Sequence, residues 1–163
     1  MKITRNAFLI FFVFLLTTVF TVNIHASNDA LKQIDTLAKQ WQVVDCRCTL
    51  GSDFSDVRSW NHPFMTMTVE PAGTVLNDSF MAGNSLISVS YNKASHKVQS
   101  LQSYCPLLKE INVLSLFEFY GDHISVEHKK DHTLHTFKTE QYTISFDFAN
   151  NVHPISYSIT HNS

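Results

Sequence analysis

Apolar residues recur at helical spacing in the segment that starts near residue 28. Polar side chains separate them, so the apolar ones share one side of a helix. The preceding Ser27 or Asn28 has a side chain suited to an N-cap. The pattern predicts a helix over about residues 28–41 that packs one face on the rest of the domain. Its apolar stripe consists of Leu31, Ile34, Leu37, Ala38 and Trp41.

From about residue 64 the apolar and polar residues alternate with a period of two. This period is typical of strands that bury one face and leave the other wet. Short turns such as Gly83-Asn84 separate the segments, which favours an antiparallel meander. The predicted strands cover residues 64–69, 74–81, 85–91, 98–101, 113–119, 123–128, 134–138, 142–148 and 155–160.

The predicted fold is mainly β (α+β), with an N-terminal helix followed by a meander of about eight or nine strands. We expect the strands to close as a barrel or a sandwich, because an open sheet leaves unpaired edges. The clearest alternation lies in the last two strands, which flank an Asn150-Asn151 turn and should form the structural centre. Their inward residues are Tyr142, Ile144, Phe146, Phe148, Ile155, Tyr157 and Ile159.

The N-terminus has the three-part pattern of a secretory signal peptide. Lys2 and Arg5 precede the uncharged run Ala7–Val22, and Ala26 supplies a small residue for cleavage. The run is shorter than the roughly 20 residues of a spanning helix. We therefore expect residues 1–26 to be removed, and residues 27–163 to form a single β-rich domain that is periplasmic or secreted, with no stable membrane span.

Composition excludes some partners. The chain has 14 acidic residues and 12 Lys or Arg, of which Lys2 and Arg5 lie in the predicted signal. The mature domain is therefore mildly acidic, and Lys129-Lys130 is its only notable basic cluster. Nucleic-acid binding is disfavoured, because phosphate contacts need a dense positive face.

Three cysteines follow the signal: Cys46, Cys48 and Cys105. A disulfide is the usual state in an oxidising compartment, and the odd count leaves one thiol over. We predict a bond between Cys48 and Cys105. Pairing of Cys46 with Cys105 remains an alternative, and a direct Cys46–Cys48 bond is possible but strained.

Histidines provide the candidate metal ligands. His128, His132 and His135 have a spacing that would converge on one face of a helix and hold zinc. The surrounding pattern is a hairpin, however, where that spacing does not converge, so solvent-exposed imidazoles are the favoured interpretation. We predict neither a metal site nor another cofactor.

No motif indicates catalysis. The chain lacks the GxSxG nucleophile elbow, and its few glycines form no phosphate-binding loop. The leading hypothesis is an exported, non-enzymatic protein of the bacterial envelope that binds a protein partner, of the inhibitor, assembly-factor or virulence-factor type. A β-barrel for a small apolar ligand is the alternative, followed by an exported hydrolase or a zinc-binding protein.

Overall fold

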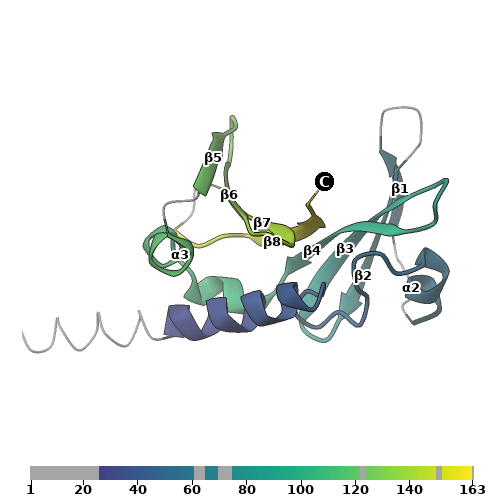
Figure 1. Cartoon of the computed structure of the whole chain (residues 1–163), viewed down its shortest axis with the longest axis horizontal. Helices are drawn as coiled ribbons and strands as arrows, with labels where there is room; N and C mark the ends of the chain where they lie inside the picture. Colours follow the sequence, from purple (N-terminus) through teal and green to yellow (C-terminus); the bar gives the residue numbers. More distant parts are fainter. Residues whose placement is uncertain (1–25, 61–64, 70–74, 122–123, 150–151, 163) are drawn as a thin grey trace, which may run out of the picture.

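A computed structural model describes residues 26–60, 65–69, 75–121, 124–149 and 152–162. The predicted signal up to residue 25 and the Asn150-Asn151 turn lie outside these residues. The described strands form one antiparallel sheet in the order β1-β2-β3-β4-β8-β7-β6-β5 (Figure 1). The strands are β1 (Met65–Val69), β2 (Val75–Ala82), β3 (Ser85–Asn92), β4 (Val98–Tyr104), β5 (Ile124–His128), β6 (Thr133–Lys138), β7 (Tyr142–Phe148) and β8 (Ser156–His161).

The fold is mainly β and antiparallel with a few helices, as predicted, but the described strands form one open sheet that is not closed into a barrel. Two four-stranded meanders, β1–β4 and β5–β8, meet where β8 pairs with β4. That pairing covers the inner edge of each meander, with Leu101 opposite Ile159. A layer of helices, rather than a second sheet, then covers the apolar face. Closure is not needed to bury the core, and β1 and β5 remain as the two edges.

Residues 26–39 are helical, and this N-terminal helix packs as its periodicity predicts. Ser27 and Asn28 lie inside the helix rather than capping it. At the other end, Trp41 is left-handed with φ 64°, and its N–H donates to Ala38 O while Gln42 N–H donates to Leu37 O. These two bonds form a Schellman motif, which ends the helix before Trp41. The buried side is formed by Ser27, Ala30, Leu31, Ile34 and Ala38.

A second helix, α2 (Phe54–Trp60), was not expected from the sequence. Asp53 precedes it, and its carboxylate accepts the N–H of Ser55 at 3.0 Å, as an N-cap does. Arg58 on α2 makes a bidentate ion pair with Asp78 on β2, at 2.6 and 2.9 Å. This pair joins the helix to the sheet.

The predicted strand over 113–119 is a helix, α3 (Val113–Tyr120), which follows the 3₁₀ helix η1 (Pro106–Glu110). Asn112 and Ser115 form a reciprocal capping box at its start. Gly121, with φ 72°, follows its last residue. The apolar residues of this segment fit both the helical period and the strand period of two. The caps are sequence signals of a helix, and they favour the helix over the strand.

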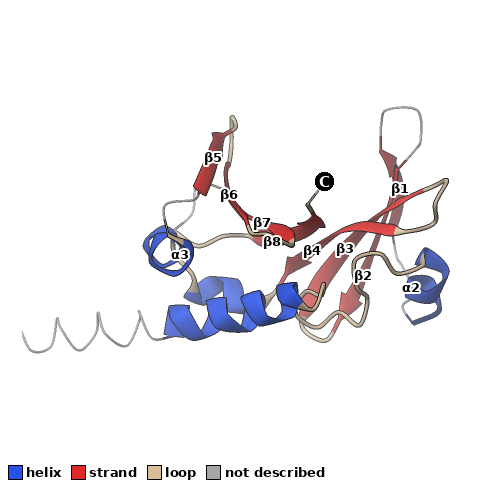
Figure 2. Ribbon diagram, in the orientation of Figure 1, coloured by secondary structure: helices blue, strands red, loops and turns tan. Residues whose placement is uncertain are grey.

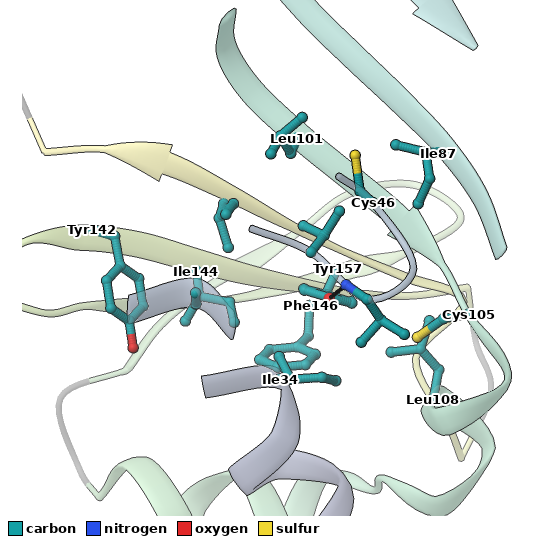
Figure 3. Close-up of a cluster of buried hydrophobic side chains, with 14 of the residues drawn as sticks. Ile34, Cys46, Ile87, Leu101, Cys105, Leu108, Tyr142, Ile144, Phe146 and Tyr157 are labelled. Atoms are coloured by element: carbon teal, nitrogen blue, oxygen red, sulfur yellow. Dashed lines mark hydrogen bonds between the residues drawn. The ribbon is translucent and has the colours of Figure 1, made fainter. Parts of the chain in front are cut away.

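Each sheet residue faces either the helices or the opposite, open face. Phe54 of α2 stacks on Tyr91 of β3, and Tyr120 of α3 packs on Phe137 of β6 at 4.4 Å between ring centroids. Ile34 of the N-terminal helix points into the same core (Figure 3). The helices in the described part of the chain therefore contact one face of the sheet (Figure 2).

The predicted centre is confirmed in most of its members. Tyr142, Ile144, Phe146, Phe148, Tyr157 and Ile159 are all buried, and most appear in Figure 3. Ile155 is 40% exposed instead, because it lies just before β8 begins. The prediction of exposed imidazoles is wrong for His135, which is buried on the helix-covered face.

Candidate binding surface

The open face is the side of the sheet that none of the described helices contacts. At one end β5 and β6, and at the other end β1, extend away from the helix layer, which makes this face concave (Figure 1). Because side chains alternate along a strand, the face carries every second residue of each strand. In β3 and β7 these alternate positions are all half-buried, whereas the intervening ones are buried.

Small polar residues line up across the middle of the open face. In the strand register each member stands opposite the next, so they form one row across seven strands. We call it the central polar row, and none of its members is charged or apolar. It consists of Ser79, Ser88, Gln102, Ser158, Ser145, Thr136 and Ser125.

A second row lies beside the first and has almost the same chemistry. Only its last member, Lys138, carries a charge. Its members, again in register, are Asn77, Ser90, Ser100, Thr160, Thr143 and Lys138. Two parallel rows of hydroxyl and amide groups therefore form the floor of the concave face.

Some of these groups bind one another and others do not. Ser79 and Ser88 share a hydrogen bond of 2.9 Å, as do Thr136 and Ser145. Within the described part of the chain, Ser158 makes no side-chain hydrogen bond, although it lies near the centre of the sheet. The floor thus combines hydroxyls that are fixed by hydrogen bonds with others, Ser158 among them, that are available to a partner.

An apolar strip borders the central polar row at one end of β2, β3 and β4. Met81 is opposite Leu86, and Leu86 is opposite Tyr104. Met81 is 59% exposed and Tyr104 36% exposed. Burial, and then the charge of Asp147, raise the pKa of Tyr104. Tyr104 therefore remains a neutral hydrogen-bonding group at neutral pH.

The Arg58–Asp78 pair lies on the other face and has a structural role. Asp78 is almost fully buried, and Tyr91 also hydrogen-bonds to Arg58, at 2.9 Å. Hydrogen bonding to Asp78 raises the pKa of Arg58, and burial raises that of Tyr91. The Asp78 carboxylate and the Tyr91 hydroxyl are both bound by Arg58, so the network serves to hold α2 on the sheet.

The three candidate histidines do not come together. His128 is exposed at the end of β5 and lies 3.3 Å from the Thr133 hydroxyl. His132 faces Asp147 at 3.2 Å. His135 packs edge-on against Phe117 and Phe148 under α3. In the described residues no group of three His, Cys, Asp or Glu side chains is arranged to hold a metal ion.

The structure shows no disulfide between the described cysteines, all of which are buried thiols. Cys48 contacts Cys46 rather than Cys105, so the predicted Cys48–Cys105 bond is not seen. Cys105 lies at the start of η1, beside Leu108 (Figure 3). No described helix is long and apolar enough to cross a membrane.

Sequence reasoning assigned the alternating serines and threonines to a solvated face but attached no function to them. The signal that could have singled them out is chemical. A wet strand face usually includes charged residues, whereas β3 offers Ser88 and Ser90, and β8 offers Ser158 and Thr160. Their alignment across the sheet depends on the strand order, which the sequence pattern does not contain.

A scan against protein-family models finds no match, and a search of curated proteins finds none either. Among solved structures, the chain is similar to YjgB, a DUF4309 family protein from Bacillus subtilis, with a TM-score of 0.67 and 14% identity. That match covers 85% of this chain and 99% of YjgB. A cysteine-rich secretory protein from Staphylococcus aureus gives a TM-score of 0.47 and 11% identity, covering 69% of this chain and 43% of that one. The likeness to YjgB shows a shared fold and nothing further.

Proposed function

We propose that this chain is an exported, non-enzymatic protein of the bacterial envelope that binds a protein partner on the open face of its sheet. The observation that carries the proposal is the central polar row, an uncharged floor across seven strands that no described element covers. The export pattern at Lys2, Arg5 and Ala7–Val22 supports the location.

Small hydroxyl side chains suit a docking floor for two physical reasons. They lose little rotamer entropy when a partner covers them, unlike long side chains such as that of Gln102, the one amide in the central polar row. They also let the partner approach the sheet closely while offering donors and acceptors to its polar groups. The neighbouring apolar strip supplies the anchors, since Met and Tyr are enriched at protein interfaces. A polar floor beside exposed Met81 and Tyr104 therefore fits a protein partner.

The other functions considered from the sequence have less support. A barrel enclosing an apolar ligand requires a closed sheet, and this sheet is open. Its apolar face is filled by the helices and by side chains such as Tyr91, Phe146 and Tyr157. The dispersed His128, His132 and His135 give a zinc site no support.

Site-specific photo-crosslinking in the producing cells tests the proposal. A photoreactive phenylalanine analogue replaces Tyr104 on the open face or, as a matched control, Trp60 on α2, which is 54% exposed on another side. We expect a discrete protein adduct from position 104 and none from position 60. Equal adducts from both positions, or none from 104, would contradict the proposal.

A second variant tests the floor itself. Ser158→Arg places a large charge at the centre of the open face without entering the core, and should reduce the adduct at position 104 by about tenfold. Ser95→Arg is the control, because Ser95 lies exposed in the β3–β4 turn. Circular dichroism verifies that both variants fold. An undiminished adduct in folded Ser158→Arg would exclude the floor as the docking site.

A further inference from the structure

The loop between the N-terminal helix and α2 brings two cysteines together in the core. Asp45 is left-handed with φ 64°, and the N–H of Cys46 donates to Val43 O at 3.1 Å, so the backbone turns tightly just before the pair. Cys46 and Cys48 are both buried, whereas Arg47 between them is exposed. The turn therefore directs both sulfur atoms to the same side.

The two sulfur atoms are in closer contact than unbonded atoms normally are. Cys46 Sγ and Cys48 Sγ are 2.6 Å apart, and the N–H of Cys48 donates to Cys46 Sγ at 3.3 Å. Ordinary contacts between non-bonded heavy atoms are about 3.5–4.0 Å, and a disulfide bond is about 2.05 Å. A small shift of either side chain would reach bonding distance.

Cys105 has a different environment. It lies beside Leu108, while Cys46 lies beside Ile87 and Leu101 (Figure 3). Its backbone carbonyl accepts the N–H of Leu108 at 3.3 Å, so Cys105 is held within the turn that begins η1. Burial raises the pKa of Cys105, which keeps its thiol protonated. Cys105 is thus the thiol left over from an odd count of three.

We propose that Cys46 and Cys48 are an oxidation site that forms an intramolecular disulfide in the mature protein, and that Cys105 stays a free thiol. The inference is independent of partner docking on the open face, and it uses the oxidising compartment expected from the export signal. The oxidant is a protein or small-molecule disulfide of that compartment. The bond closes a ring that contains only Arg47 between its two cysteines.

The chemistry is a double thiol–disulfide exchange. The Cys48 thiolate attacks one sulfur of the oxidant, forms a mixed disulfide and expels the other sulfur as a thiolate. Cys46 then loses its proton and attacks Cys48 Sγ, which releases the second thiolate. Two cysteine thiols give up two electrons and two protons, and one disulfide becomes two thiols.

The environment selects the order of these steps. The hydrogen bond from the Cys46 thiol lowers the pKa of Cys48, and the same contact raises the pKa of Cys46. Cys48 is therefore the first nucleophile. Cys48 is fully buried in the folded domain, so the oxidant reaches its thiolate through a local opening that exposes the Cys46–Cys48 turn.

The bond would fix a loop that connects the helix layer to the sheet. Val44 N–H donates to Tyr157 Oη on β8 at 2.8 Å, and the carboxylate of Asp45 accepts from Ser85 Oγ on β3 at 2.6 Å. These two residues immediately precede Cys46. The disulfide would hold the loop in the conformation that makes both contacts.

Trypsin offers a direct test, because it cleaves after Lys39, Arg47, Arg58, Lys97 and Lys109. The three cysteines then fall into separate peptides, residues 40–47, 48–58 and 98–109. Protein from its native compartment is denatured with an alkylating reagent and digested without reduction. We expect 40–47 joined to 48–58, or an uncleaved 40–58 that lacks two hydrogens, with Cys105 alkylated.

Matched variants make the outcome decisive. Cys105→Ser should leave the linked peptide unchanged, while Cys48→Ser should leave both remaining thiols free to alkylate. If Cys48→Ser fails to fold, Cys46→Ala replaces it, and the same result is expected: both remaining cysteines are alkylated. Three alkylated cysteines in the wild type would overturn the proposal, and so would a 48–58 peptide joined to 98–109. Neither result depends on whether a partner binds the open face.

Discussion

The hydroxyl of Tyr157 accepts the backbone N–H of Val44 at 2.8 Å, in the middle of the core. Tyr157 is fully buried on β8 and Val44 is almost fully buried in the cysteine-containing loop. The bond therefore satisfies a donor that has no access to water. Burial is also the main reason that the pKa of Tyr157 is strongly raised, so the phenol stays neutral.

Tyr157→Phe should lower the free energy of unfolding by about 1–3 kcal/mol, because Val44 N–H would be left buried without an acceptor. Chemical denaturation measures the change. Tyr104→Phe, on the partly exposed open face, is the control and should cost under about 0.5 kcal/mol. Equal costs for the two variants would mean that the Val44 bond contributes little.

Phe146→Ala should lower the free energy of unfolding by about 3–5 kcal/mol, because Phe146 is fully buried between Phe137 and Tyr157 and its removal leaves a cavity. Equilibrium denaturation provides the value. Phe117→Ala is the same substitution at a ring that is 39% exposed on α3, and it should cost clearly less. A larger loss at Phe117 would show that the core is centred elsewhere.

Gly83→Ala should destabilise the β2–β3 hairpin by about 1–2 kcal/mol for its positive φ of 56° alone. A Cβ at Gly83 would also lie 3.1 Å from Cγ of Asp45, which adds a steric cost. Thermal unfolding of Gly83→Ala in the wild type and in Asp45→Gly separates the two terms. Gly83→Ala should lower the stability less in the Asp45→Gly background than in the wild type. If the effects of the two substitutions simply add, crowding by Asp45 is excluded.

The buried His135 should make stability depend on pH. Burial and then the charge of His128 lower its pKa, so the folded state favours the neutral ring. Above the ordinary histidine pKa of about 6.5 there is no penalty, and below it the unfolded chain binds a proton that the folded chain resists. Stability should therefore fall as the pH drops from about 6.5 towards the lowered pKa.

His135→Leu should flatten this part of the pH profile, because it removes the proton-binding group and keeps the contacts with Phe117 and Phe148. Urea titrations at a series of pH values measure the slope. His96→Gln, at an exposed turn position, is the control and should keep it. An unchanged slope in His135→Leu would assign the effect to other groups.

Local sequence patterns predicted most individual elements of this fold. The stripe from Leu31 to Ala38 identified the N-terminal helix, and strict alternation located β7 within one residue. The pattern failed at Val113–Tyr120, where alternating apolar residues also fit a helix. In this segment the Asn112–Ser115 capping box and Gly121 are the sequence features that indicate a helix.

Long-range arrangement is what the pattern could not supply. Alternation says that Ser158 and Ser145 face away from the core, but only the pairing of β8 with β7 places them side by side. The contact of Cys46 with Cys48, likewise, depends on the left-handed backbone at Asp45, which no periodicity encodes. His135 is buried because α3 covers β6. The sequence pattern predicted a strand for the residues that form α3, so it could not predict this burial.

The pairing of β8 with β4 has a consequence for the order of folding. Every other pairing in the sheet joins consecutive strands, whereas this one joins segments that are separated by η1, α3 and three strands. Closing so long a loop is slow, because its entropy is lost before the contact is gained. During synthesis the first meander would therefore wait with the edge of β4 unpaired until the residues of β8 arrive. The two meanders become one cooperative unit only when β8 pairs with β4. A chain that ends before Ser156 lacks β8, so the edges of β4 and β7 stay unpaired and open to aggregation.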